Sequence, residues 1–164
     1  MGITLSAAIF TIAVTLITKK NQDLNLENFA LKNGITFFND SKSTIIESTL
    51  EAIETLNKEY PEKEKTVIIG GLNKGVDRIE KINFISKKVN NLIFFGGDDK
   101  EVSILKNNNL IYFEKTLKNA IDKAIKETKE NGIILFSPGG SSFDLFESYE
   151  ERGKIFKDIV NNEF

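Results

Sequence analysis

Four short segments of the sequence consist mainly of small, polar or Gly residues, so their backbone amides, hydroxyls and lysines can approach a ligand closely. They are Asn39–Thr44, Gly70–Gly75, Gly96–Asp99 and Ser137–Asp144. Each directly follows a short apolar run that is typical of a buried strand. Because open α/β sheets bind ligands beyond the carboxyl ends of their strands, the four segments predict a site for phosphate or carboxylate groups.

The glycine loops do not match the common nucleotide-binding patterns. In Gly70–Asp77, Leu72 stands where the dinucleotide-binding pattern requires its second glycine. In the same loop, Val76 stands where the phosphate-loop pattern requires lysine. The pair Gly96–Gly97 has no third glycine at the required spacing. The sequence therefore predicts neither an NAD site nor a self-sufficient ATP site.

The segment Asn39–Thr44 has two interpretations. In the first, Ser43 or Thr44 caps the helix that follows, and Glu47 completes a capping box. In the second, Lys42 and the helix N-terminus bind a phosphate or carboxylate. A cation in the first helical turn opposes the helix dipole, so Lys42 is expected to have an anionic partner.

The other two candidate loops also leave alternatives open. Lys74 is either a solvated surface lysine or, because Gly71 and Gly75 flank it, a cation that leans over a ligand. The residues Ser137–Ser142 either only form a turn, which their residue types favour, or form a nest of amides and hydroxyls that binds a carboxylate.

The composition limits the chemistry. The 164 residues include no Cys and no His, which excludes disulfides, thiolate catalysis, zinc–thiolate sites and any histidine general base. The net charge is −2, and basic and acidic residues alternate without a basic block, which argues against nucleic acid as a partner. Lys, Arg, carboxylates, hydroxyls and backbone amides remain, and these suit the handling of phosphates and carboxylates.

Short apolar strands and amphipathic helices alternate from residue 26 onward. The five strands expected to be parallel are Ile35–Phe38, Thr66–Ile69, Leu92–Phe95, Leu110–Phe113 and Ile133–Phe136. The helices expected after them are Thr44–Lys58, Asp77–Val89, Asp99–Lys106, Lys115–Glu130 and Tyr149–Asn161. This alternation predicts a three-layer, Rossmann-like α/β domain with a mostly parallel sheet of about six strands. Leu26–Leu31, joined to the next strand by an Asn33–Gly34 turn, is expected to be an antiparallel edge strand.

The first 23 residues differ from the rest. Gly2–Thr18 is uncharged and is followed by Lys19–Lys20, but it is shorter than the roughly 20 residues of a membrane span and contains Thr and Ser. We favour a buried helix over a membrane anchor, and we place a domain boundary between residues 23 and 24.

Three ordered motifs resemble a known family. They are Asn39–Thr44 after Asn33–Phe38, then Ile68–Gly75, then Leu135–Phe146 with Tyr149–Gly153. Together they resemble the C-terminal domain of the Mur ligase family, in particular of the member that adds D-glutamate to UDP-N-acetylmuramoyl-L-alanine. The resemblance covers residues 26–164.

The resemblance implies specific roles but assigns no catalytic residue to this chain. The residues expected to hold the α-carboxylate of D-glutamate are Thr44 and Lys74. Those expected to hold its side-chain carboxylate are Ser142 and the backbone around Phe143 and Tyr149. Those expected to face the nucleotide and the neighbouring domain are Asp40 and Lys42. Arg152 and Phe156 are expected to be structural.

The family's reaction is a cytoplasmic, ATP- and Mg²⁺-dependent amide ligation in peptidoglycan precursor synthesis. The family's UDP-binding and central ATPase domains find no match here, so we expect the fragment to be inactive alone and residues 1–23 to be a remnant of the central domain. An excised domain, a truncated reading frame and half of a split gene all fit. The alternative is a stand-alone, non-catalytic module that binds an amino acid or nucleotide, with or without a membrane anchor at Gly2–Thr18.

Overall fold

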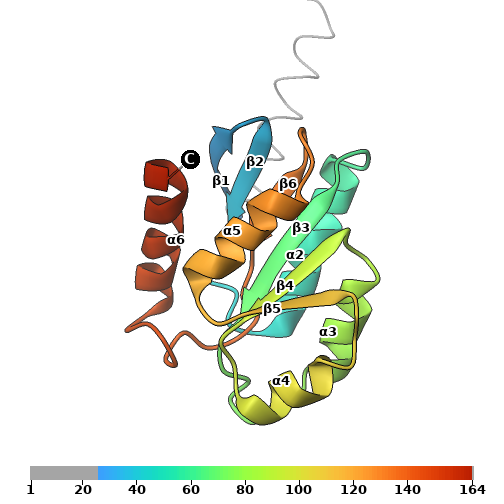
Figure 1. The fold of residues 1–164 in the computed structure, drawn as a ribbon, viewed down its shortest axis with the longest axis vertical. Coiled ribbons are helices and arrows are strands. Elements are labelled where there is room, and N and C mark those ends of the chain that lie inside the picture. The colour runs from blue at the N-terminus through green and yellow to red at the C-terminus, as the bar shows by residue number, and fades with distance from the viewer. Residues whose placement is uncertain (1–25, 164) are drawn as a thin grey trace, which may run out of the picture.

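A computed structural model describes residues 26–163 as a six-stranded sheet with helices on both faces (Figure 1). The strands are β1 (Glu27–Lys32), β2 (Ile35–Asn39), β3 (Lys65–Gly70), β4 (Asn91–Phe95), β5 (Ile111–Glu114) and β6 (Ile133–Phe136). The helices are α2 (Ile46–Glu59), α3 (Ile79–Ser86), α4 (Asp99–Leu105), α5 (Leu117–Glu127) and α6 (Tyr149–Glu163).

The strand order is β1-β2-β6-β3-β4-β5. Strand β1 is antiparallel to β2, and the remaining neighbours are parallel, which confirms the predicted fold class. Asn33 (φ 50°) and Gly34 (φ 76°) both adopt positive φ, the backbone of the two-residue hairpin turn that their sequence predicts. The sheet therefore begins with the expected hairpin and continues as a parallel sheet.

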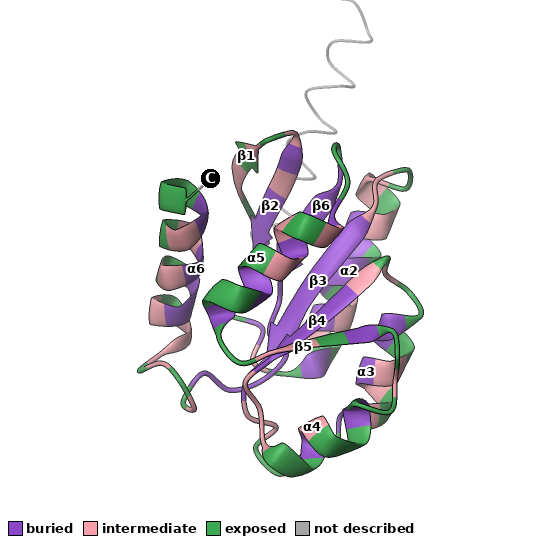
Figure 2. Ribbon diagram, in the orientation of Figure 1, coloured by how far each residue is buried: buried purple, intermediate pink, exposed green. Residues whose placement is uncertain are grey.

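Alternation of side chains along the strands divides the core into two layers. In β6, Leu135 faces α2, α3 and α4, whereas Phe136 faces α5 and α6. Phe136 stacks on Phe156 of α6 with ring centroids 4.5 Å apart, so Phe156 fixes that helix on the sheet. Figure 2 shows the central strands buried along most of their length. The sheet and the helices on each of its two faces form the three predicted layers.

Helices α4 and α6 begin at the predicted residues, and the other three begin two residues later than the sequence patterns suggest. Helix α2 begins at Ile46 instead of Thr44, and α5 begins at Leu117 instead of Lys115. Ile45 and Thr116 immediately before them are extended, with ψ of 148° and 157°. Helix α3 likewise begins two residues after its predicted start, so the loops at this edge are longer than expected.

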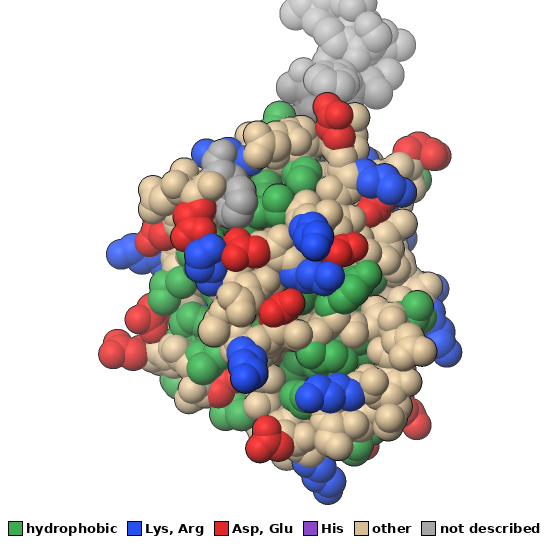
Figure 3. Space-filling model, in the orientation of Figure 1, with side chains coloured by type: hydrophobic (Ala, Val, Ile, Leu, Met, Phe, Trp, Pro, Cys, Tyr) green, Lys and Arg blue, Asp and Glu red, His purple; other side chains and the backbone are tan. Residues whose placement is uncertain are grey.

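The expected apolar helix, its membrane-anchored alternative and the boundary after residue 23 lie outside the described residues. Within residues 26–163, no helix has the length and apolar character needed to cross a membrane. On the face shown in Figure 3, lysine and acidic side chains are interspersed, as the sequence pattern suggests.

Candidate functional site

The four candidate loops lie together at the carboxyl edge of the sheet. They follow β2, β6, β3 and β4, which are consecutive neighbours in the strand order. Leu72 and Ser141 exchange two backbone hydrogen bonds of 3.1 and 2.8 Å, and the Gly139 amide donates to the Ser43 carbonyl at 2.9 Å. Three of the loops are therefore joined through their backbones.

A buried arginine binds two of these loops to helix α4. Arg78 is 3% exposed, and its Nη1 donates to the carbonyls of Gly70 at 3.1 Å and Gly139 at 2.7 Å. Its Nη2 donates to the Gly71 carbonyl, and Nε and Nη2 form a bidentate pair with Glu101 at 2.8 and 2.9 Å. All five N–H groups of the guanidinium therefore have an acceptor.

A second arginine joins the loop after β2 to the loop after β6. Arg152 of α6 is fully buried, and it donates to the carbonyls of Ser41 at 2.9 Å and Gly140 at 3.0 Å. Burial lowers the pKa of Arg152 to about 10, so the guanidinium remains charged at neutral pH. These contacts agree with the structural role expected for Arg152.

The Gly-Gly pairs of these loops allow their backbones to touch. A Cβ atom on Gly140 would lie 2.3 Å from both the Gly70 carbonyl oxygen and Arg78 Nη1. A Cβ atom on Gly71 would lie 2.1 Å from the Ser141 carbonyl oxygen. Side chains at Gly71 or Gly140 would therefore force the two loops apart.

Asp40 lies beneath the loops and not at their surface. It is 2% exposed, and its Oδ2 accepts hydrogen bonds from Ser43 at 2.5 Å and Ser137 at 2.6 Å. Burial raises the pKa of Asp40 to about 7, although the two hydroxyls and the Arg152 charge favour the ionised form. The carboxyl group therefore links the loops after β2 and β6.

The predicted capping of α2 is wrong. The N-cap of α2 is Ile45, and no side chain caps it. The Ser43 hydroxyl donates to Asp40, and Glu47 pairs with Lys81 of α3. The first amides of α2 consequently have no side-chain cap, and half-buried Thr44 lies just before them.

Lys42 precedes α2 by four residues and is not in its first turn, so the argument from the helix dipole does not apply to it. It lies instead near the start of α6. The Glu150 carboxylate there has a lowered pKa, chiefly because Tyr149 donates a hydrogen bond to it, and the Lys42 charge adds a smaller contribution. The same hydrogen bond raises the pKa of Tyr149, which is half-buried at the first position of α6.

Lys74 is exposed at the tip of the loop after β3, and its backbone is left-handed at φ 53°. Such a conformation is uncommon outside glycine and marks a position held by its surroundings. Asn73 holds it here, because its Oδ1 accepts from the Gly75 amide at 2.9 Å and its Nδ2 donates to Asp98 at 2.8 Å. Asp98 is in turn the N-cap of α4.

Ser142 is buried beside this loop, and the Phe143 side chain is 71% exposed. The Ser142 carbonyl accepts from the Leu145 and Phe146 amides at 3.2 and 2.9 Å, which forms a tight turn. Among the described residues, neither the Ser142 amide nor the Phe143 amide donates to another group. Two adjacent amides of this kind can bind a carboxylate.

The structure therefore brings the predicted residues onto neighbouring loops. Thr44 follows Ser43, Ser142 follows Ser141, and Lys74 is two residues beyond Leu72, which pairs with Ser141. Sequence reasoning did not identify Arg78 and Glu101. One signal was available: 20 of the 22 basic residues are lysines, and the two arginines both lie at this edge, where arginine's planar fork suits buried pairs.

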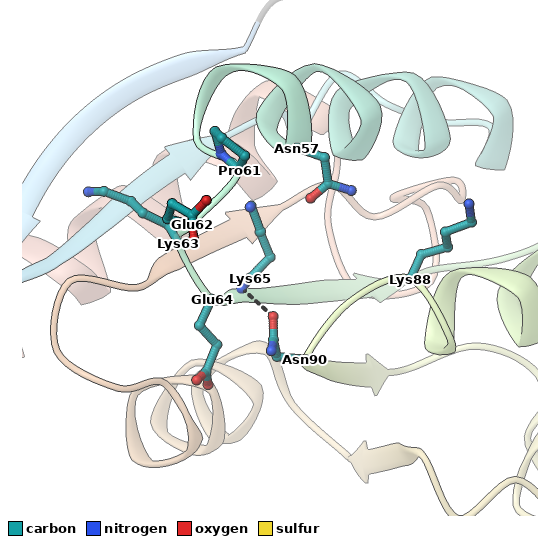
Figure 4. A pocket seen from close by; sticks show the side chains of 8 residues that line it. All are labelled: Asn57, Pro61, Glu62, Lys63, Glu64, Lys65, Lys88 and Asn90. Carbon is teal, nitrogen blue, oxygen red and sulfur yellow. Dashed lines mark hydrogen bonds between the residues drawn. The ribbon is translucent and has the colours of Figure 1, made fainter.

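A cavity of about 410 Å³ lies at the opposite, amino edge of β3 (Figure 4). Its lining residues are Asn57, Pro61, Glu62, Lys63, Glu64, Lys65, Lys88 and Asn90. Lys65 is buried, which lowers its pKa, and its ammonium donates to the Tyr60 carbonyl at the C-terminus of α2. Because a helix C-terminus repels anions, these contacts stabilise the helix end and do not make a second anion site.

The part of the chain that the structure describes has no cluster of three or more His, Asp or Glu side chains that could hold a metal ion. The carboxyl-edge loops combine two lysines and four aspartates with hydroxyls and backbone amides. The lysines, hydroxyls and amides among these groups can bind an anionic ligand.

Comparison with known proteins identifies relatives of this chain. No family model matches the sequence. The chain is 34% identical over 154 residues to the UDP-N-acetylmuramoylalanine–D-glutamate ligase of Thermoanaerobacter sp. (strain X514), covering 91% of this chain and 33% of that protein. It is also 34% identical over 129 residues to the ligase of the same name from Aquifex aeolicus, covering 78% and 30%. The chain belongs to the Mur ligase family.

Solved structures of Mur ligases share the fold. A murein peptide ligase from Psychrobacter arcticus matches 84% of this chain and 30% of its own length, with a TM-score of 0.60 and 10% identity. A domain from a proposed UDP-N-acetylmuramate:L-alanyl-gamma-D-glutamyl-diaminopimelate ligase of Haemophilus ducreyi matches 82% of this chain and 98% of its own length, with a TM-score of 0.55 and 14% identity. The fold is that of a Mur ligase C-terminal domain, and the chain spans about a third of the length of its curated relatives.

Proposed function

We propose that this domain binds D-glutamate and presents its amine for ATP-dependent ligation to UDP-N-acetylmuramoyl-L-alanine in peptidoglycan precursor synthesis. The observation that carries the proposal is that Thr44, Lys74 and Ser142 lie on or beside three neighbouring loops that are joined by backbone hydrogen bonds. The names of the relatives supply the substrate, and the two kinds of anion-binding group fit its two carboxylates.

The α-carboxylate is assigned to Lys74 and Thr44. Lys74 is exposed and is held at the loop tip by Asn73, so its ammonium can reach a ligand above the loops. Thr44 is beside the uncapped N-terminus of α2, where amides and the helix dipole favour an anion. A charge-assisted hydrogen bond from Lys74 then contributes roughly 1.5–3 kcal/mol.

The side-chain carboxylate is assigned to the turn at Ser142. Its hydroxyl and the adjacent amide of Phe143 are the donors, and Tyr149 closes this end of the site at the start of α6. Lys42 and Asp40 are assigned to the side that faces the nucleotide and the neighbouring domain. Lys42 is exposed and can contact a phosphate directly, whereas buried Asp40 acts through the loop hydroxyls that it holds.

In the proposed reaction, the carboxylate of the UDP-linked substrate takes the terminal phosphoryl group of ATP, which forms an acyl phosphate and releases ADP. The D-glutamate amine attacks the acyl carbon, the C–N bond forms, the bond to phosphate breaks, and the amine loses a proton. Holding the amine at this carbon lowers the barrier by orientation. ATP and Mg²⁺ are assigned mainly to domains beyond this chain, and the reaction to the cytoplasm, where ATP is available.

A titration tests the proposal. The ¹⁵N-labelled chain is titrated with D-glutamate and L-glutamate while its amide shifts are followed. The expected result is saturable movement of the amides of the loops after β2, β3 and β6, with D-glutamate binding more tightly. Movement confined to other residues, or equal affinity for both enantiomers, would contradict the proposal.

A further inference from the structure

Arg78 is the only residue among those described that makes hydrogen bonds to the loops after β3 and β6 and to helix α4 through one side chain. On one side it holds Gly70 and Gly71, which begin the loop that carries Lys74. On the other it holds Gly139, three residues before Ser142. The guanidinium thus lies between the loop that carries Lys74 and the loop that carries Ser142.

We propose that Arg78, oriented by Glu101, is a positioning residue that sets the spacing of the two carboxylate sites and so selects the chain length of the dicarboxylic amino acid. This inference rests on the proposed function. Arg78 does not touch the ligand in this account, because it is buried and its five N–H groups are all used.

The geometry makes the spacing rigid for three reasons. A planar guanidinium fixes the directions of its donors, which a flexible lysine ammonium does not. Glu101 fixes the plane of the guanidinium by a bidentate contact, and both side chains are about 3% exposed, so water does not compete. The absence of a side chain on Gly140 lets the guanidinium lie against the loop, since a Cβ there would come within 2.3 Å of Nη1.

Helix α4 contacts both Arg78 and the loop that carries Lys74. Its Glu101 orients Arg78, and its N-cap residue Asp98 accepts from Asn73 next to Lys74. The position of Lys74 relative to Ser142 therefore depends on helix α4 and Arg78 as well as on the backbone bridge between Leu72 and Ser141. Ligands that are one methylene shorter or longer than glutamate are expected to bind both sites less well unless these contacts move.

The test compares the wild-type chain with Arg78→Lys, Glu101→Gln and a control, Glu127→Gln, which removes the surface pair with Lys123 on α5. Each is titrated with D-aspartate, D-glutamate and D-2-aminoadipate by amide NMR. The wild type and the control are expected to prefer D-glutamate by roughly tenfold or more over both homologues. In Arg78→Lys and Glu101→Gln, the preference is expected to fall to within about threefold.

A merely structural role makes a different prediction. If Arg78 only stabilised the fold, the variants would bind all three ligands weaker by one common factor, and the preference for D-glutamate would be unchanged. That result in a folded variant would overturn the inference and leave the proposed function intact. A wild-type chain that binds none of the three ligands would instead contradict the proposed function and the length selection together.

Hydrogen exchange tests the loop positioning without any ligand, and it applies even if one variant is too unstable to titrate. The amides of Leu72 and Ser141 donate the two hydrogen bonds of the bridge between the loops. In Glu101→Gln, these amides are expected to exchange at least about tenfold faster than in the wild type, whereas those of α5 keep their rates. Unchanged exchange at Leu72 and Ser141 would overturn the positioning role.

Discussion

Replacing Asp40 by Asn is expected to remove a pH dependence of stability that the structure places on this one carboxyl group. Burial raises the pKa of Asp40 from its ordinary value of 3.8 to about 7. The folded protein therefore holds a proton at Asp40 between about pH 4 and pH 7, where the unfolded chain does not. The contribution of Asp40 to the free energy of unfolding is therefore at its maximum below pH 4 and is lost as the pH rises towards 7.

The magnitude follows from the two pKa values. Each unit of pKa difference corresponds to about 1.4 kcal/mol, so the wild type should lose about 2–3 kcal/mol of unfolding free energy between pH 5 and pH 8 because of Asp40. Asp40→Asn cannot ionise, and it keeps an acceptor for the Ser43 and Ser137 hydroxyls. At pH 8 the variant should be at least as stable as the wild type.

The assay is urea unfolding at pH 5, 6, 7 and 8 for the wild type, Asp40→Asn and a control, Asp158→Asn, which removes an exposed carboxylate on α6. The difference in unfolding free energy between wild type and Asp40→Asn should change with pH, and that between wild type and the control should not. Parallel pH profiles for wild type and Asp40→Asn would refute the assignment of a raised pKa to this group.

Two further predictions concern Lys74 and the chain as a whole. Lys74→Gly should be about 1 kcal/mol more stable to urea than Lys74→Ala, because φ of 53° suits glycine and strains alanine; equal stabilities would mean that the loop relaxes without cost. The 164-residue chain alone should neither hydrolyse ATP nor form the amide bond, because Val76 breaks the phosphate-loop pattern after Gly75. Phosphate release above a no-enzyme control, with Mg²⁺ and all substrates present, would contradict this.

The fold was predictable because its signals are local. Asn33–Gly34 specifies a hairpin turn by itself, and each apolar strand was recognisable from a run of four to six residues. Helix starts were less predictable. Ser43 has the side chain of a cap, but its hydroxyl donates to Asp40, and Ser137, which follows β6 and is 97 residues from Asp40, donates to the same carboxylate oxygen. The capping pattern in the sequence does not reveal this tertiary network.

The loops of the candidate site were predictable from the sequence, and the buried side chains that hold these loops together were not. The Gly-rich segments had to follow strands, so their meeting at one edge followed from the topology. The pairing of Arg78 with Glu101 spans 23 residues and two helices, and no spacing rule predicts it. The burial of Asp40 was equally hidden, because an aspartate in a polar loop is ordinarily exposed.

The central claim is that Lys74 binds the α-carboxylate of D-glutamate, and one comparison of dissociation constants tests it most directly. D-glutamate is titrated into the wild-type chain, Lys74→Ala and a control, Lys126→Ala, which removes an exposed lysine from α5. Loss of a charge-assisted hydrogen bond worth roughly 1.5–3 kcal/mol should weaken binding by about ten- to a hundredfold in Lys74→Ala and leave the control unchanged. Equal affinity of wild type and Lys74→Ala would contradict the site assignment.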